Sequence, residues 1–384
     1  MRNEKEIDFL FLISRPPIMD AGYVVKHAMY LAEGVNSKGY SSALLILPQS
    51  EIRTALIRRK RKVMSLGLFL LSFIYSTLFF SRVSTHFFLM INKKMNRSAF
   101  EFNPHSGIRI FYGNTSCLSF SKRVICNDWI TASYLQDKVD MRKGYFIVYH
   151  SHENDIKELS DVVVSTYHKW HNIIVTNETI RKKFDLDKRT TIIPAIDANK
   201  ISDENNELRK ANFVLIPLRK NPIKGAEYAI EAIDLLLRER SDITICTFGD
   251  YNLSHPVNSK WKHLGIVTDE VLVSLFREAE VLVSPSVEDG VPGIAVEAMA
   301  NGCAVISTDV SGARDLIEDG YNGMIIPIKD SKAIVNSITF LLMHRDVLIK
   351  FQNNAKTISR KFSKEMMVDS FLNAVDYYEK VKTK

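Results

Sequence analysis

The chain has little cysteine, and none of it lies at a spacing typical of metal sites or redox motifs. Its 384 residues include four cysteines, Cys117, Cys126, Cys246 and Cys303. Thiols scattered in this way do not fit a disulfide framework or a zinc site, and they are typical of a reduced, cytosolic protein.

The sequence also lacks internal repeats, low-complexity tracts and a nucleic-acid-binding motif. Its start, MRNEKEIDFLFLI, contains acidic residues and only a short apolar run, which predicts a first strand and not a signal peptide. A metal-binding pattern of paired aspartates does not stand out: Asp185 and Asp187 lie beside a basic helix end and are interpreted as surface charge. We therefore expect no obligatory metal.

The length of the chain and its net charge indicate how many domains it has and which partners it binds. A chain of 384 residues is too long for one ordinary core and predicts two domains. The formal net charge of +7 favours anionic partners, such as nucleotide diphosphates or acidic lipid.

Short apolar runs alternate with helical patterns along the chain, which predicts an α/β fold with parallel sheets. Ile7 to Ser14 and Ser42 to Pro48 are expected strands on either side of a helix over 23–36. A second series of strands and helices begins at Asn212. We expect a first domain over 1–195, a second over 196–361, and an amphipathic helix over 362–384.

A basic and apolar segment interrupts the first domain at 53–91. RTALIRRKRK is followed by an uncharged run, Val63 to Ser81, that has the length of a membrane-spanning helix. The run predicts a buried core helix, an interfacial membrane helix with a basic collar, or a true span. The sequence leaves these three interpretations open.

The most informative stretch runs from Val283 to Gly323, at the end of a strand that begins at Val281. VLVSPS predicts a buried parallel strand, which is followed by an acidic loop rich in glycine and proline and by a helix start at Ile294. Such loops lie at the carboxyl end of the strand, where open parallel sheets bind ligands, and N–H groups at a helix start suit a phosphate. Because carboxylates repel phosphate, Asp289 and Glu297 are expected to bind sugar or ribose hydroxyls.

This stretch resembles the signature of the retaining nucleotide-sugar glycosyltransferases of family 4, the glycosyl transferases group 1. In that family two glutamates separated by seven residues flank a Gly-Pro loop, and Asp289 and Glu297 have this spacing here. The chain thus has Asp in place of the first Glu, and the choice between Glu288 and Asp289 as the residue that contacts the donor sugar stays open. The resemblance implies the GT-B fold, in which two Rossmann-like domains face a central cleft and the C-terminal helix crosses back to the first domain.

The resemblance also implies a donor site in the second domain. Arg219 and Lys224 match the family's arginine and lysine, which neutralise the leaving diphosphate. Gly312 resembles a glycine of the family's next loop, with Ser311 in place of a second one, and this loop is interpreted as structural. The expected donor-binding residues are Arg219, Lys224, Asp289, Gly290, Val291, Pro292, Gly293, Ile294 and Glu297, of which Arg219, Lys224 and Asp289 are also expected to be catalytic.

Two motifs resemble the family in the first domain. ICNDWITA contains its Asp-Trp pair, with Asn127 at the usual histidine, and GYFIVYHSHEND is similar to the rhamnosyltransferase-like members of polysaccharide synthesis. His152 takes the position of the family's catalytic histidine. Gly22, Asp128 and His150 are candidates for the acceptor side.

The resemblance implies transfer of a sugar, with retention of anomeric configuration, from a UDP-, GDP- or dTDP-sugar to a glycan or polyprenyl-linked acceptor. The expected place is the cytoplasm, at the inner face of the cell membrane, with a peripheral membrane contact through 53–91. A non-catalytic GT-B protein that binds nucleotide or glycan as a partner, and a nucleotide-sugar epimerase, are the alternatives.

Overall fold

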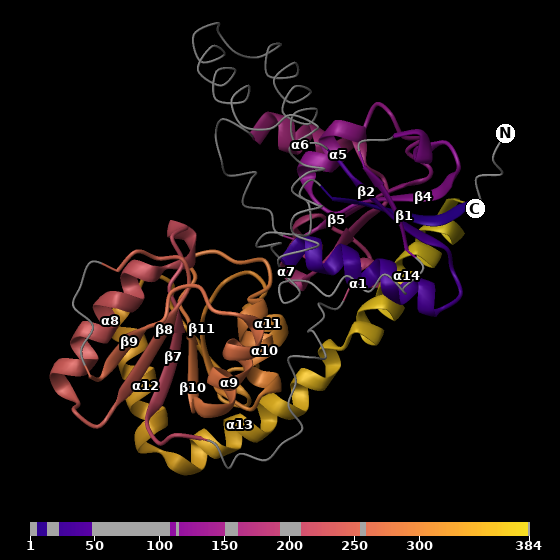
Figure 1. Ribbon diagram of the computed structural model, residues 1–384. Helices are drawn as coiled ribbons and strands as arrows, with labels where there is room; N and C mark the ends of the chain where they lie inside the picture. The colour runs from indigo at the N-terminus through magenta and orange to yellow at the C-terminus, as the bar shows by residue number, and fades with distance from the viewer. Residues whose placement is uncertain are drawn as a thin grey trace, which may run out of the picture. The chain divides into compact units, whose positions relative to one another are not determined.

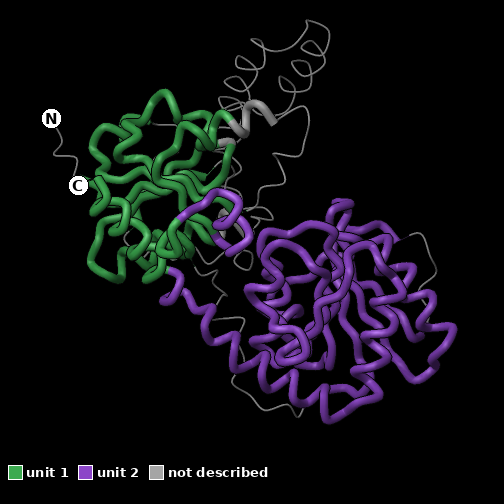
Figure 2. The backbone as a smooth tube through the Cα atoms, turned by 180° about the vertical axis from the view of Figure 1, so that it is seen from behind, with its two compact units in different colours: residues 1–175, 187–192, 368–384 green, residues 176–186, 193–367 purple. Residues whose placement is uncertain are grey.

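A computed structural model describes residues 6–13, 23–47, 108–112, 115–149, 160–192, 209–253 and 259–382. It divides into two compact units, which Figure 2 shows in green and purple. Unit 1 consists of residues 1–175, 187–192 and 368–384, and unit 2 of residues 176–186 and 193–367. The two units are described separately.

Unit 1 contains a six-stranded parallel sheet in the order β3-β2-β1-β4-β5-β6 (Figure 1). This is the doubly wound order of a Rossmann-like domain, in which the chain starts at a central strand and builds outward in both directions. The strands are β1 (Ile7–Ile13), β2 (Ser42–Ile46), β3 (Arg109–Tyr112), β4 (Ser121–Cys126), β5 (Gly144–Val148) and β6 (Ile173–Val175). The helical elements are α1 (Tyr23–Ser37), η1 (Thr115–Leu118), α5 (Trp129–Leu135), α6 (Ser160–Lys169) and η3 (Lys188–Thr190).

The C-terminal helix α14 (Lys364–Lys382) packs on the sheet of unit 1 through its residues from Val368 onward. The ring of Phe371 lies 5.7 Å from that of Phe9 in β1, and the Tyr378 hydroxyl donates to the Ile173 carbonyl at 2.6 Å. At the surface the Arg123 guanidinium binds the Glu379 carboxylate at 2.6 Å. Burial of aromatic rings and paired polar groups both hold this helix in place.

Unit 2 repeats the doubly wound pattern with the strand order β12-β11-β10-β7-β8-β9, all parallel. Its strands are β7 (Phe213–Pro217), β8 (Thr244–Phe248), β9 (Trp261–His263), β10 (Val281–Ser284), β11 (Ala304–Thr308) and β12 (Gly323–Ile326). Its helical elements are α7 (Glu178–Lys183), η6 (Pro222–Lys224), α8 (Ala226–Glu239), α9 (Asp269–Glu278), α10 (Gly293–Ala300), α11 (Ala313–Leu316), α12 (Ser331–Met343), α13 (Arg345–Ser359) and η7 (Arg360–Phe362).

An ion pair between the buried carboxylate of Glu280 and the half-exposed Arg345 fixes α13 against the central strand β10 of unit 2. The Glu280 carboxylate, almost fully buried at the start of β10, accepts from the Arg345 guanidinium at 2.8 Å and from the Asn212 N–H at 2.8 Å. Gln352 of α13 also donates to the Glu280 carbonyl at 3.1 Å. A charged carboxylate can be buried at this position because its oxygens accept hydrogen bonds and are paired with a cation.

The predicted α/β class with two parallel-sheet domains is confirmed. The expected strands at Ile7 to Ser14 and Ser42 to Pro48 correspond to β1 and β2, and the expected helix over 23–36 to α1. One boundary was wrong: α10 begins at Gly293, which the sequence had placed in the loop before the helix.

The basic and apolar segment 53–91 lies outside the described residues, so its three interpretations stay open. Within the ranges that the structure describes, none of the helices combines the length and the apolar character needed to cross a membrane.

The carboxyl group of Asp8 makes the stability of unit 1 depend on pH in the acid range. Although partial burial raises the pKa of its carboxyl, bonds from Lys122 Nζ at 2.9 Å and from the N–H and hydroxyl of Ser41 outweigh it and lower the pKa from 3.8 to about 2. A depressed pKa stabilises the fold above the unfolded value, and this contribution is lost as pH falls through the folded value. Because the side chain of the paired Lys122 is 47% exposed, solvent screens this interaction, and the contribution at pH 7 is about 1 kcal/mol.

We expect Asp8→Asn to lose this contribution at pH 7. As pH falls from about 5 to about 2, the difference in unfolding free energy between the wild type and the variant should shrink. Chemical denaturation at several pH values measures it. Asp376→Asn removes an exposed carboxylate of α14 as a control, and a constant difference for Asp8→Asn across this range would contradict the assignment.

Candidate nucleotide-sugar site

The loops after β7, β8, β10 and β11 place polar residues at the carboxyl edge of the unit 2 sheet. The strand order reverses between β7 and β10, because β8 and β9 lie beyond β7 and β11 and β12 lie beyond β10. In open parallel sheets this switch point, at the carboxyl ends of the strands, is where ligands bind.

Lys224 and Asp289 meet at this switch point. The Lys224 ammonium, at the end of η6, lies 2.7 Å from Oδ2 of Asp289, in the loop after β10. Lys224 Nζ and the Asp289 carboxylate therefore offer a cation and hydroxyl-binding oxygens side by side.

The backbone holds these two loops together. The Ile223 carbonyl accepts from the N–H groups of Val287 at 2.8 Å and Glu288 at 3.1 Å. Gly225 follows Lys224 with a φ of +67°, and a Cβ there would lie 2.0 Å from the Pro285 carbonyl oxygen. Only glycine fits both the left-handed backbone and the close approach.

Arg219 lies on the exposed loop after β7 and pairs with Asp250, which follows β8. Arg219 Nε is 3.1 Å from Asp250 Oδ1, and the Lys220 N–H donates to the same oxygen at 2.9 Å. Partial burial alone raises the pKa of Asp250, but the Lys220 N–H and the Arg219 charge lower it overall. The carboxylate therefore orients the guanidinium at the same sheet edge.

The helix α10 begins at the end of the loop after β10, and its N-cap side chain does not cap the first turn. Its N-cap residue is Pro292, whose side chain makes no capping hydrogen bond, and the helix runs from Gly293 to Ala300. The N-terminal N–H groups and the helix dipole there suit a phosphate. Glu297, half-buried, lies one turn into the helix.

The loop after β11 supports the loop after β10. The Thr308 hydroxyl donates to the Ser284 carbonyl at 3.2 Å and also to the Ser286 carbonyl, and the Ser311 hydroxyl donates to the Asp289 carbonyl at 2.8 Å. Gly312 approaches so closely that a Cβ would lie 1.9 Å from the Gly290 carbonyl oxygen. The interpretation of this second loop as structural agrees with these contacts.

Gly312→Ala should therefore displace the Gly290 peptide. Because the atom in the way is backbone, the loop must shift, and we expect binding of a nucleotide sugar to weaken about tenfold. Titration calorimetry measures the affinity. Gly39→Ala, which strains a left-handed backbone in unit 1 but has open space around it, serves as the stability control; equal effects of the two changes on affinity would contradict this role.

The candidates from the first domain are only partly described. Gly22, His150 and His152 lie outside the described residues. Asp128 is described, and its Oδ1 caps α5 by accepting from the Thr131 N–H at 2.7 Å. Among the described residues no cluster of His, Cys, Asp and Glu has the arrangement of a metal site.

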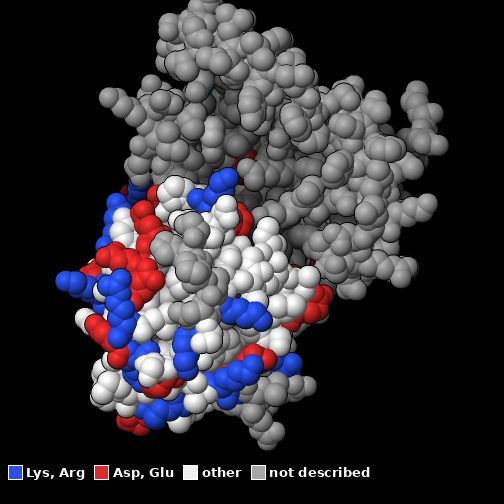
Figure 3. Space-filling view, turned by 60° about the vertical axis from the view of Figure 1, so that its left-hand side comes forward, with Lys and Arg blue, Asp and Glu red and all other residues white. Residues whose placement is uncertain are grey.

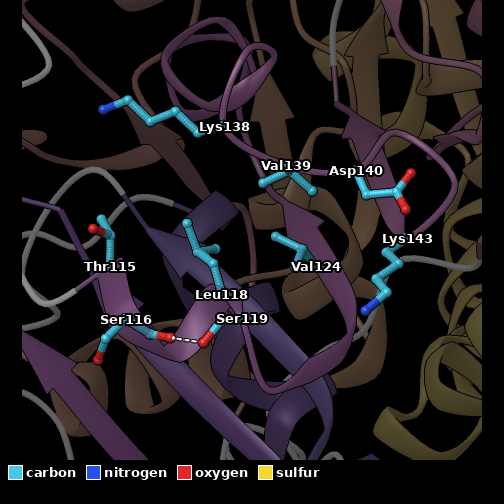
Figure 4. A pocket seen from close by; sticks show the side chains of 9 residues that line it. All are labelled: Thr115, Ser116, Leu118, Ser119, Val124, Lys138, Val139, Asp140 and Lys143. Atoms are coloured by element: carbon cyan, nitrogen blue, oxygen red, sulfur yellow. Dashed lines mark hydrogen bonds between the residues drawn. The ribbon is translucent and has the colours of Figure 1, made fainter.

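An open pocket of about 460 Å³ in unit 1 lies at the edge of the sheet where the strands begin, and not at the edge where they end (Figure 4). It is lined by η1, by Val124 of β4 and by the segment from Lys138 to Lys143, which precedes β5. These segments mark the amino ends of β4 and β5, and Figure 4 shows Lys138 and Lys143 on opposite sides of the view. Since ligands of such sheets bind at the carboxyl ends, the pocket is not the candidate active site.

The described surface that Figure 3 shows has Lys and Arg side chains interspersed with Asp and Glu. On that face the positive net charge is therefore not gathered into a single basic patch, as it would be on a surface that binds nucleic acid.

The two doubly wound sheets are those of a GT-B fold, and part of unit 2 is similar in sequence to a family of glycosyltransferases. Residues 209–344 match the family model described as Glycosyl transferases group 1. The comparisons confirm the predicted kinship with the group 1 glycosyltransferases.

Over nearly the whole chain the structure is similar to HepE of Anabaena, solved in complex with UDP-glucose. The TM-score is 0.66 at 14% sequence identity, and the match covers 97% of this chain and 100% of that one. At this identity the likeness shows the fold alone.

Curated relatives also match at the sequence level, among them two glycosyltransferases. The chain is 28% identical over 187 residues to a Campylobacter jejuni α-1,4-N-acetyl-D-galactosaminyltransferase named for an undecaprenol-diphosphate-linked acceptor, covering 45% of this chain and 51% of that protein. It is 25% identical over 182 residues to the capsular polysaccharide biosynthesis glycosyltransferase CapM of Staphylococcus aureus, covering 45% and 48%. The chain thus spans about half the length of the curated relatives it matches.

Sequence reasoning missed three residues that this site uses. Asp250 has a visible signal, since it follows Gly249 at the end of a strand, where site residues of parallel sheets concentrate. Thr308 also ends a strand, but its role depends on the neighbouring loop. Asn177 also follows a strand, β6, but its Nδ2 donates to the Gly290 carbonyl 113 positions away, and local sequence does not indicate that contact.

Proposed function

We propose that this protein is a retaining glycosyltransferase that moves a sugar from a nucleotide-sugar donor to a glycan or lipid-linked glycan in cell-surface polysaccharide synthesis. The main observation in support is the meeting of Lys224, Asp289 and the uncapped start of α10 at the switch point of the unit 2 sheet. A donor needs cations and N–H groups for its diphosphate and acceptors for its hydroxyls, and this edge supplies both.

Each residue has a chemical task in this proposal. Lys224 and Arg219 bind the diphosphate and stabilise the charge that grows on it as it leaves, which is usually the largest contribution to catalysis. Asp289, held next to Lys224, accepts from hydroxyls of the transferred sugar. The backbone from Gly290 to Ile294 is proposed to donate to the diphosphate or the sugar through its N–H groups, apart from Pro292, which has none, and Gly293, which donates to the Val291 carbonyl at 2.8 Å. Glu297 is proposed to accept from the ribose hydroxyls.

Transfer with retention is proposed to proceed by substitution on one face of the sugar. The acceptor oxygen bonds to the anomeric carbon on the side from which the diphosphate leaves, the bond from that carbon to the phosphate oxygen breaks, and the acceptor proton passes to the leaving phosphate. His152, which matches the family's histidine, is proposed to contact the reacting sugar, and Gly22, Asp128 and His150 are proposed for the acceptor side. No step requires a metal.

The acceptor class is supported by the names of the relatives, one of which acts on an undecaprenol-diphosphate-linked glycan and another in capsular polysaccharide biosynthesis. A lipid-linked acceptor places the enzyme at the inner face of the cell membrane, and the basic and apolar segment 53–91 is proposed to make the peripheral contact. The donor is proposed to be a UDP-, GDP- or dTDP-sugar.

The proposal is tested by incubating the protein with each nucleotide sugar and polyprenyl-diphosphate-linked glycans. A product whose new linkage has the anomeric configuration of the donor, measured by NMR, would support it. Nucleotide binding without transfer would instead favour a non-catalytic partner protein, a role that the Asp at 289 leaves open. Conversion of the donor sugar without an acceptor would favour an epimerase.

A further inference from the structure

The short helix α7 (Glu178–Lys183) belongs to unit 2, although the strand β6 just before it belongs to unit 1. The residue between strand and helix that begins α7 is Asn177, whose Oδ1 caps the helix by accepting from the Ile180 N–H at 2.8 Å. With 1% of its surface exposed, Asn177 is fully buried, so its second polar group also needs a partner.

That partner is a backbone atom of the donor loop. Nδ2 of Asn177 donates to the Gly290 carbonyl oxygen at 2.8 Å across 113 positions of sequence. The next residues of α7 bind the segment after β11: the Glu178 N–H donates to the Asp315 carboxylate of α11 at 2.7 Å, and the Thr179 hydroxyl donates to the Ser311 carbonyl of the loop before α11 at 2.9 Å. The start of α7 therefore contacts both loops of the candidate site.

These bonds fix the orientation of two consecutive peptide groups. Ser311 binds the Asp289 carbonyl and Asn177 binds the Gly290 carbonyl. In a planar trans peptide the N–H points opposite to the carbonyl, so the N–H of Gly290 is turned away from Ser311 and that of Val291 away from Asn177. Both N–H groups belong to the segment proposed to bind the donor.

We propose that Asn177 is a positioning residue that holds the loop from Asp289 to Val291 in the conformation that binds the nucleotide sugar. This inference rests on the proposed function of that loop. Asn177 touches neither sugar nor phosphate in this proposal; it acts through the Gly290 peptide, while Gly312 limits movement of the same peptide from another contact.

Without Asn177, part of the free energy of donor binding would be used to order the loop. If only a fraction of molecules has the loop in its binding conformation, the apparent dissociation constant rises by the inverse of that fraction. Saturating donor restores the order, so KM should rise while kcat at saturation stays nearly constant. A residue that only stabilised the fold would lower Tm without this separation of KM from kcat.

Asn177→Ser isolates the contact, because a serine hydroxyl still caps a helix but is too short to reach Gly290. We expect the dissociation constant for the donor to rise about tenfold, with KM following it. Amide hydrogen exchange over residues 288–294, measured without ligand, should become about tenfold faster. The matched control is Asp330→Ser, which makes a similar cap exchange at α12, away from the donor loop, and should change neither quantity.

Thr179→Val is a second variant, and it should not destabilise the fold, because Thr179 is exposed and valine has a similar shape. It should accelerate exchange in the same segment by a smaller factor. Unchanged exchange and donor affinity in Asn177→Ser would overturn the inference while leaving the proposed function intact. If the wild type bound no nucleotide sugar, the proposed function would fall, and the ligand-free exchange measurement would still decide whether Asn177 holds the loop.

Discussion

Replacing Lys224 by methionine should reduce kcat/KM for sugar transfer about a thousandfold. The ammonium that lies 2.7 Å from Asp289 is proposed to supply the positive charge for the departing diphosphate at the switch point. Methionine keeps most of the length and volume of the side chain and removes only the charge. Because charge on the diphosphate grows as the bond breaks, the loss should appear in kcat as well as in KM.

The control for this change is Lys220→Met, four residues earlier in the same loop. Lys220 contributes its backbone N–H to Asp250, but its exposed side chain has no part in the proposed site. We expect this variant to keep wild-type rates. Steady-state kinetics with both variants measures the difference, and similar rates for Lys224→Met and the wild type would exclude Lys224 from the reaction.

Replacing Glu297 by glutamine should weaken donor binding about a hundredfold. A carboxylate that accepts from both ribose hydroxyls forms two charge-assisted hydrogen bonds, each stronger than a neutral one, and the amide can accept with only one of its two atoms. The loss should affect the nucleotide alone as much as the whole nucleotide sugar, because the ribose belongs to the nucleotide. Calorimetry with the nucleoside diphosphate and with the sugar-linked form measures this.

Glu288→Gln is the matched control, since it makes the same substitution in the loop that leads to α10. The structure pairs Asp289, and not Glu288, with Lys224, so we expect the Glu288 variant to bind the donor nearly as well as the wild type. A large loss in Glu288→Gln together with a small one in Glu297→Gln would reverse the assignment of the two carboxylates.

The sequence predicted those parts of the site that depend on local patterns. The run from Val281 to Ser286 followed by glycine and proline indicated a strand and then a loop, and both are present as β10 and the segment before α10. The binding of a ligand by that loop stays a prediction. The predicted resemblance also selected Lys224 and Asp289, which the structure brings into contact.

Contacts between distant segments were not predictable in the same way. Asn177 lies 113 positions from Gly290, and nothing in its own neighbourhood distinguishes it from an ordinary helix cap. The pairing of Arg219 with Asp250 likewise depends on β7 and β8 being neighbours in the sheet. The order of strands in the unit 2 sheet determines the second contact, and residue spacing predicts neither.

The central claim is that the switch point of the unit 2 sheet binds a nucleotide sugar. Ligand-induced thermal stabilisation against UDP-, GDP-, ADP- and dTDP-sugars tests it most directly, with Lys224→Met measured alongside. A donor present at about 100 times its dissociation constant should add about 2.7 kcal/mol to the stability of the wild type. We predict that sugars of one nucleotide stabilise the wild type and that Lys224→Met loses most of this effect. Stabilisation by none of the donors, or equal stabilisation of the wild type and Lys224→Met, would contradict the account.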